Sequence, residues 1–150
     1  MRAYKVYAIK NGTVIDHIPA TKGMQIIELL KLQQWNKAVT LGAGFKSKKH
    51  GKKDIIKIED KELSPEEVNK IAVIAPTATI NIIRDFKISK KFRPQLPEVL
   101  EAIIKCPNPA CVTNHDPVAK TRFYKEPGKK FEISCAYCER YFSDLDIELL

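Results

Sequence analysis

Two short stretches near the end of the chain, CPNPAC at residues 106–111 and CAYC at residues 135–138, decide how the last third folds. They contain all four cysteines of the 150-residue sequence. Four thiolates in two close pairs suit one tetrahedral zinc ion that is clamped by two turns. The spacing therefore predicts one structural zinc site, with Cys106, Cys111, Cys135 and Cys138 as its ligands.

Two disulfides, four separate buried thiols and a rubredoxin-type iron site are the alternatives for these cysteines. Thiols in the cytosol stay reduced, and four cysteines within the last 45 residues favour a metal. Iron sites of that type usually have tighter and more symmetric ligand spacing. His115, between the two pairs, is the competing ligand candidate. Four protein ligands leave no position open for water, so we do not expect metal catalysis here.

The residues around the cysteines suggest short strands between turns. A segment of about 50 residues buries little surface alone and usually needs a staple such as a metal ion. The sequence thus predicts a small all-β zinc-ribbon domain over residues 98–150. Zinc ribbons serve nucleic-acid binding and protein docking alike. The apolar residues near the cysteines suit either a core or an exposed docking face: Val112, Tyr137, Tyr141, Phe142 and Leu145.

The first part of the chain predicts an α+β domain over residues 1–92, followed by a linker at 93–97. Ser64, Pro65 and Glu67 have the spacing of a helix start with a capping box. The segment from Phe45 to Lys53 is expected to be a charged, flexible hairpin connection. Strands are expected at 4–10, 13–18, 38–45, 54–59 and 78–88, and helices at 22–32 and 65–75. After the first turn, this order is that of a ferredoxin-like βαββαβ sandwich.

Composition limits the function to a few classes. The net charge of +8 favours anionic partners. There is no glycine-rich phosphate loop, so side-chain cations would have to hold a phosphate. The sequence also has no nucleophile motif, which argues against an enzyme. It has neither a membrane-length apolar run nor a signal peptide, so we expect no membrane association and a cytoplasmic location.

Several segments together resemble the regulatory chain of aspartate carbamoyltransferase. They are GTVIDHIPA (12–20), KDIIKIE (53–59), LSPEEVNKIAVIAPTATIN (63–81) and the two cysteine stretches. They follow one another in the family's order over nearly the whole chain. The resemblance implies a non-catalytic allosteric subunit in pyrimidine biosynthesis. Its N-terminal domain would bind the effectors CTP, ATP and UTP, and its zinc domain would dock on the catalytic chain.

The resemblance further implies that regulatory chains pair as homodimers and bridge two catalytic trimers. It assigns Asp16 and Lys57 to the ribose of the effector, with Lys57 also near phosphate. It assigns His17 and Lys91 to the phosphates. The base pocket that it implies is formed by Val6, Ala8, Ile9 and Ile88, and is completed by Asn81 and Ile83.

Two positions depart from the family's pattern. Tyr7 stands where a glutamate can occur, and Phe86 where a tyrosine is usual, so a phenol hydrogen bond is lost there. The alternative hypothesis is a zinc-ribbon protein that binds nucleic acid through its positive charge. The basic residues are spread over both domains rather than along one stripe, and we therefore expect no nucleic-acid partner.

Overall fold

The computed structural model describes residues 8–47, 51–128, 131–143 and 147–150. The chain forms two compact units, the first ending at Gln95 and the second beginning at Leu96. The elements of the first unit are β1 (Gly12–Pro19), α1 (Gly23–Leu29), the 3₁₀ turn η1 (Leu32–Gln34), β2 (Val39–Ser47), β3 (Gly51–Glu59), α2 (Pro65–Ile74), β4 (Thr79–Arg84) and β5 (Lys87–Phe92).

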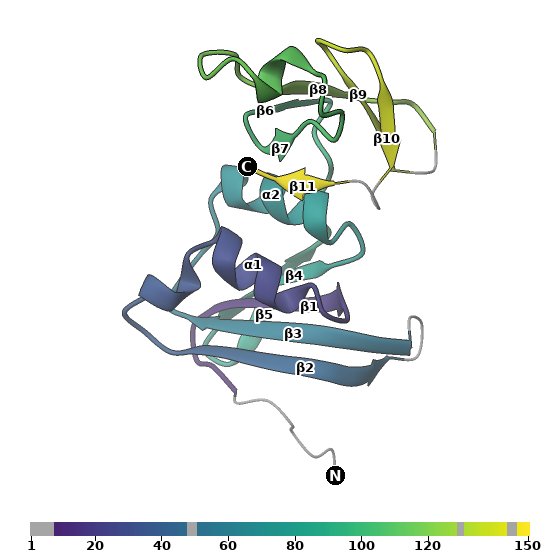
Figure 1. Cartoon of the computed structure of the whole chain (residues 1–150). Helices are drawn as coiled ribbons and strands as arrows, with labels where there is room; N and C mark the ends of the chain where they lie inside the picture. Colours follow the sequence, from purple (N-terminus) through teal and green to yellow (C-terminus); the bar gives the residue numbers. More distant parts are fainter. Residues whose placement is uncertain (1–7, 48–50, 129–130, 144–146) are drawn as a thin grey trace. The chain divides into compact units, whose positions relative to one another are not determined.

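The first unit is an antiparallel sheet with the strand order β2-β3-β1-β4-β5. Its two α-helices lie on one side of the sheet (Figure 1). The strands β1 to β4 have the order of a ferredoxin-like sandwich, in which β3 separates β1 from β2. The predicted α+β fold is confirmed, with β5 as an additional strand. We call the side of the sheet away from α1 and α2 the open face.

The core lies between the sheet and the helices, and isoleucine dominates it. Along β3, every second residue from Asp54 to Ile58 is buried, whereas the residues between them are partly exposed. This period of two assigns alternate side chains to the two faces of the sheet. Ile15 of β1 and Ile80 of β4 join the same buried cluster, which is completed by Ile26 of α1.

The predicted start of the second helix is confirmed, whereas the first helix ends earlier than predicted. The Ser64 hydroxyl accepts a hydrogen bond from the Glu67 N–H at 3.2 Å, and the Glu67 carboxylate accepts one from the Ser64 N–H at 3.0 Å. This capping box starts α2, which ends two residues before Pro76. The first helix is shorter than expected, because Lys31 adopts a left-handed conformation with a φ of 54°.

Three expectations for the extended segments are wrong in whole or in part. Residues 78–88 form a hairpin, β4 and β5, rather than one strand, because Asp85 and Phe86 make a two-residue turn with φ values of 50° and 64°. The segment 45–53 is not simply a connection, since β2 continues to Ser47 and β3 begins at Gly51. Of the expected strand at 4–10, residues 8–10 are not in a strand and 4–7 lie outside the described residues.

A buried carboxylate fastens α1 to the strands. Asp54 is 2% exposed and accepts hydrogen bonds from the backbone N–H groups of Gly23 and Gly44, each at 3.0 Å. Gly44 lies in the bulge of β2, where its φ of 72° suits glycine. Asp54 therefore ties the first residue of α1 to the bulge across β3.

The start of β1 depends on a glycine. A Cβ atom at Gly12 would lie 2.0 Å from the carbonyl oxygen of Ile58, and the φ of Gly12 is 142°. The preceding residue, Asn11, accepts hydrogen bonds from Asp60 N–H at its carbonyl and from Asp85 N–H at its side chain. The Asn-Gly pair thus begins β1 and contacts the β4–β5 turn.

The second unit consists of short strands, as predicted: β6 (Val99–Glu101), β7 (Ile104–Lys105), β8 (Arg122–Lys125), β9 (Glu132–Cys135), β10 (Tyr141–Ser143) and β11 (Glu148–Leu149), with the 3₁₀ turn η2 (Val112–Asn114). Four strands pair in the order β10-β9-β8-β6, and β11 pairs with β7. Leu100, Ile104, Phe123 and Ile133 are fully buried and form its small core. None of the helices that the structure describes in either unit is long and apolar enough to cross a membrane.

Candidate functional site

The four cysteine sulfurs of the second unit lie within 4.8 Å of one another. The Sγ atoms of Cys106 and Cys138 are 3.7 Å apart, and those of Cys111 and Cys135 are 3.8 Å apart. A tetrahedral zinc ion with bonds of about 2.3 Å to sulfur requires sulfur–sulfur distances of about 3.8 Å. Disulfide-bonded sulfurs are about 2.05 Å apart, so none of these pairs is a disulfide. The cluster therefore fits a single metal ion.

Two loops present these sulfurs. Cys106 follows β7 and Cys111 precedes η2, whereas Cys135 ends β9 and leads into the turn that carries Cys138. Asn114 fixes the first loop, because its amide donates to the carbonyls of Cys106 at 3.0 Å and Asn108 at 2.8 Å. Reasoning from sequence did not identify Asn114, whose partners lie eight and six residues earlier in the chain.

Hydrogen-bond donors surround the sulfurs. The Tyr137 N–H donates to Cys135 Sγ at 3.4 Å, and the Thr113 hydroxyl lies 3.2 Å from Cys111 Sγ. Such contacts orient metal ligands and stabilise their thiolate form. His115 is not part of the sulfur cluster, because its Nε2 donates instead to the Pro109 carbonyl at 2.8 Å.

Burial opposes ionisation of most of this cluster. It raises the pKa of the Cys106 and Cys135 thiols. Burial would also raise the pKa of Cys138, but hydrogen bonds from the Arg140 backbone and the Asn108 side chain outweigh it and bring that pKa to about 7. Without a cation, the Cys106 and Cys135 thiols stay protonated at neutral pH. A bound divalent metal would stabilise the thiolate form of the cysteines.

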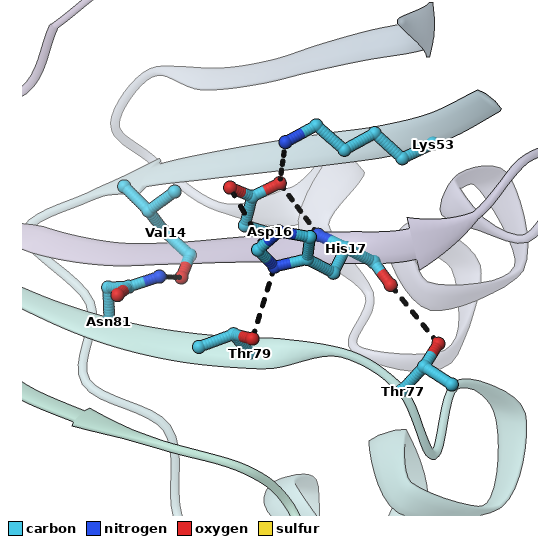
Figure 2. Close-up of polar contacts among 7 residues, drawn as sticks. All are labelled: Val14, Asp16, His17, Lys53, Thr77, Thr79 and Asn81. Atoms are coloured by element: carbon cyan, nitrogen blue, oxygen red, sulfur yellow. Dashed lines mark hydrogen bonds and ion pairs between the residues drawn. The ribbon is translucent and has the colours of Figure 1, made fainter. Parts of the chain in front are cut away.

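A second candidate site lies on the open face of the first unit. Lys57 of β3 pairs with Val14 of β1, Val14 pairs with Asn81 of β4, and Asn81 pairs with Lys91 of β5. Directly paired residues share a face of the sheet, so these four side chains form one row across it. Figure 2 shows the Asn81 amide donating to the Val14 carbonyl, at 3.3 Å.

An irregularity in β1 lies beside this row, two to three residues along the strand from Val14. His17 has a φ of 57°, and the register of β1 against β3 shifts there. Its N–H donates to Asp16 Oδ1 at 2.6 Å, its Nδ1 lies 3.1 Å from the Thr79 hydroxyl, and its carbonyl accepts from the Thr77 hydroxyl at 3.2 Å (Figure 2). Lys53 Nζ lies 2.9 Å from Asp16 Oδ1.

The contacts of His17 and Asp16 use three residues that sequence reasoning did not single out: Lys53, Thr77 and Thr79. A signal was available, because both threonines lie within the segment LSPEEVNKIAVIAPTATIN (63–81) and Lys53 is the first residue of KDIIKIE (53–59). Together they hold a carboxylate and an imidazole in fixed positions at the edge of a basic row.

The remaining residues that the resemblance assigns to the effector site lie on β4, on β5 or before β1. Ile83 and Ile88 pair with each other, and Ile83 shares the open face with Asn81 by strand alternation. A shift of register in β5 brings Ile88 and Lys91 to the same face although they are three residues apart. Ile9 is buried and Ala8 exposed just before β1, and Val6 lies outside the described residues.

The open face has the chemistry of an anion site. Partial burial lowers the pKa of Lys57 from its ordinary value, and the charge of Asp16 partly offsets this effect. A desolvated ammonium group gains more from an anionic ligand than a fully hydrated one. A carboxylate beside it, at Asp16, is a suitable acceptor for hydroxyl groups of a ligand.

The two units match two family models in the same order. Residues 4–95 match the allosteric domain of the aspartate carbamoyltransferase regulatory chain, and residues 98–148 match its metal binding domain. The chain belongs to the family of aspartate carbamoyltransferase regulatory chains. The resemblance inferred from sequence is therefore confirmed.

Individual regulatory chains are similar over almost their full length. Those of Pyrococcus abyssi and Pyrococcus horikoshii are each 51% identical over 149 residues, which cover 98% of this chain and 97% of theirs. That of the bacterium Porphyromonas gingivalis is 44% identical over 145 residues, which cover 97% and 95% of the two chains. These relatives are regulatory chains of the enzyme, so the expectation of a non-catalytic subunit is also confirmed.

Proposed function

We propose that this regulatory chain binds nucleoside triphosphates of the CTP, ATP and UTP type on the open face of its first unit. The observation that supports this most strongly is the row from Lys57 through Asn81 to Lys91, bordered by Asp16 and His17. Lysines at both ends of the row suit a ligand with several negative charges. Asp16 accepts hydrogen bonds from the ribose, and His17 and Lys91 approach the phosphates.

The base of the effector lies against the apolar part of the same face. Ile88 provides exposed apolar surface there, and its partner Ile83 is buried beside it. Val6, Ala8 and Ile9 belong to the segment that precedes β1. Backbone N–H and C=O groups are donors and acceptors whose positions do not depend on side-chain identity. Recognition through them allows one site to accept both a pyrimidine and a purine.

The second unit holds one structural zinc ion through its four cysteines and docks on the catalytic chain. The sulfur–sulfur distances of 3.7 and 3.8 Å fit one tetrahedral metal ion. Zinc is the metal most often bound by four cysteines in a structural site. Regulatory chains pair as homodimers through the first unit, and their zinc domains join catalytic trimers in the cytoplasm. Effector binding changes catalysis only if the nucleotide binds one quaternary state more tightly than the other.

Calorimetry with CTP tests the nucleotide site. The Lys57→Ala variant is expected to bind CTP about tenfold more weakly or worse, because it loses a charged contact to the ligand. Lys87→Ala is the matched control: it removes an exposed lysine of β5 that pairs with Arg84 at the hairpin end. Unchanged affinity in Lys57→Ala, or no CTP binding by the unaltered chain, would contradict the proposal.

A further inference from the structure

The turn that carries Cys135 and Cys138 is closed by its own backbone. Glu139 N–H donates to the Cys135 carbonyl at 2.9 Å, and Cys135 N–H donates to the Arg140 carbonyl at 3.0 Å. The φ of Glu139 is 61°, in the left-handed region that tight turns use. Backbone hydrogen bonds thus hold these two cysteines in place.

The loop that begins at Cys106 has fewer backbone donors. It is longer than the other cysteine turn, and it contains Pro107 and Pro109, which have no backbone N–H. The carbonyls that precede these prolines belong to Cys106 and Asn108. Both accept a hydrogen bond from the side-chain amide of Asn114, at 3.0 Å and 2.8 Å. A side chain of η2 therefore supplies donors that the prolines cannot provide.

Asn108 connects this loop to the other cysteine turn. Its backbone N–H donates to the Cys106 sulfur, and its side-chain amide donates to the Cys138 sulfur. These two sulfurs come from different loops and are 3.7 Å apart. The side-chain oxygen of Asn108 accepts a hydrogen bond from Ala110 N–H at 3.1 Å, and the residue is buried. Asn108 is thus fixed on its own loop while it contacts a sulfur of the other.

We infer that Asn108 and Asn114 are positioning residues that hold the two cysteine loops together and slow the release of the metal. This inference rests on the metal site proposed above and adds two residues outside its four ligands. The loops have to separate before the metal can leave. Separation breaks the contact between Asn108 and Cys138, and movement of the first loop breaks the contacts of Asn114. These hydrogen bonds therefore oppose release.

The rate of zinc release from the loaded full-length chain to an excess of a chromogenic chelator measures this role. Asn114→Ala should release zinc about tenfold faster than the unaltered chain, because loss of the groups that orient metal ligands weakens a site by about 10–100-fold. Asn114→Asp should also accelerate release, since it keeps the size of the side chain but has no N–H.

A spectroscopic measurement tests the contact between Asn108 and the sulfurs directly. Cobalt in place of zinc gives absorption bands that arise from charge transfer from sulfur to the metal. A hydrogen bond to a thiolate stabilises its electrons. Asn108→Ala removes the side-chain donor and should shift these bands to lower energy.

Two controls separate this role from a general loss of stability. Leu100→Val shortens a fully buried side chain of β6, so it weakens the core of the same unit without removing a hydrogen bond of either loop. His115→Ala removes the contact between an exposed ring and the Pro109 carbonyl of the same loop. Both should release zinc more slowly than Asn114→Ala, and neither should shift the cobalt bands.

A double variant tests whether the two asparagines act as one unit. Asn114 holds the carbonyl of Asn108, so part of its effect passes through that residue. Combining Asn108→Ala with Asn114→Ala should therefore accelerate release by less than the product of the two single effects.

Each outcome has a distinct meaning. Unchanged release in Asn114→Ala, an equal increase in either control, unshifted cobalt bands in Asn108→Ala, or fully multiplicative effects would each overturn the inference while the metal site stands. If Asn114→Ala retains no zinc and both controls retain it, the inference is supported. If the unaltered chain binds no metal, the proposed function of the second unit fails instead.

Discussion

Lys57 experiences two opposing electrostatic effects. Desolvation lowers its pKa from the ordinary value of 10.5, and the neighbouring charge of Asp16 raises it again in part. In the folded chain the net result is a lowered pKa of Lys57. At pH values between this lowered pKa and 10.5, Lys57 therefore binds more protons in the unfolded chain than in the folded chain. The contribution of Lys57 to the free energy of unfolding therefore increases as the pH rises through this window.

The affinity for CTP should depend on pH in the opposite sense. Phosphate groups favour the charged form of Lys57, so binding takes up a proton once the pH passes the lowered pKa, and affinity falls as pH rises further. Calorimetry in two alkaline buffers of different ionisation enthalpy measures this proton uptake. The control is Lys57→Arg, whose guanidinium stays charged in this range, and it should show less uptake. Equal uptake in both chains would contradict this assignment.

The role of residues that recur at a regular spacing could be predicted from the sequence. Contacts between residues far apart in the sequence could not. The cysteine pairs were recognisable because metal ligands need fixed spacing within each loop. Asp54 gave no such signal, since its partners Gly23 and Gly44 lie 31 and 10 residues away. The family resemblance pointed to Asp16 and His17, but not to the threonines that hold His17.

At the scale of elements, the β4–β5 hairpin shows why a turn can escape detection. Two-residue hairpin turns usually contain Asn-Gly or Asp-Gly, because both positions need positive φ. Here the pair is Asp85-Phe86, and a bulky aromatic residue at a φ of 64° is costly. The sequence from Ala78 to Ile88 therefore looked like one strand. By contrast, the capping box of α2 joins residues only three positions apart, so the sequence was sufficient to predict the start of this helix.

Replacing Phe86 by glycine should stabilise the first unit by about 1 kcal/mol, because it relieves the left-handed strain. Phe86 is 66% exposed, so little packing is lost. Urea unfolding of the variant and the unaltered chain measures the difference in unfolding free energy. Phe86→Ala is the comparison, since it removes the ring but keeps the Cβ. If the alanine variant gained as much as the glycine variant, strain would not be the cause.

At the scale of the whole molecule, each unit has its own core. The isoleucine cluster belongs to the first unit, whereas the second has four fully buried apolar side chains and the sulfur cluster. A core this small does not sustain a domain of about 55 residues without further support. The sequence predicted that the second unit needs a metal, because this short segment contains all four cysteines.

Removing the metal should unfold the second unit selectively. A chelator is expected to expose the backbone amides from Leu96 onward to hydrogen exchange, while β1, β3 and β4 stay protected. Exchange followed by mass spectrometry locates the change, and metal analysis before treatment should give one zinc ion per chain. Adding zinc back is the control. Loss of protection in both units together, or in neither after the metal has left, would contradict this expectation.

The Asn11–Gly12 pair at the start of β1 has a consequence for the chemical ageing of the protein. Asparagine followed by glycine deamidates readily when the glycine nitrogen is free to attack the side-chain amide. In the folded chain the Asn11 side chain bonds to Asp85, and the Ile58 carbonyl lies directly against Gly12. Folding thus protects the Asn11 side-chain amide from deamidation. In a heated sample, the fraction of Asn11 converted to aspartate would therefore increase with the time that the chain had spent unfolded.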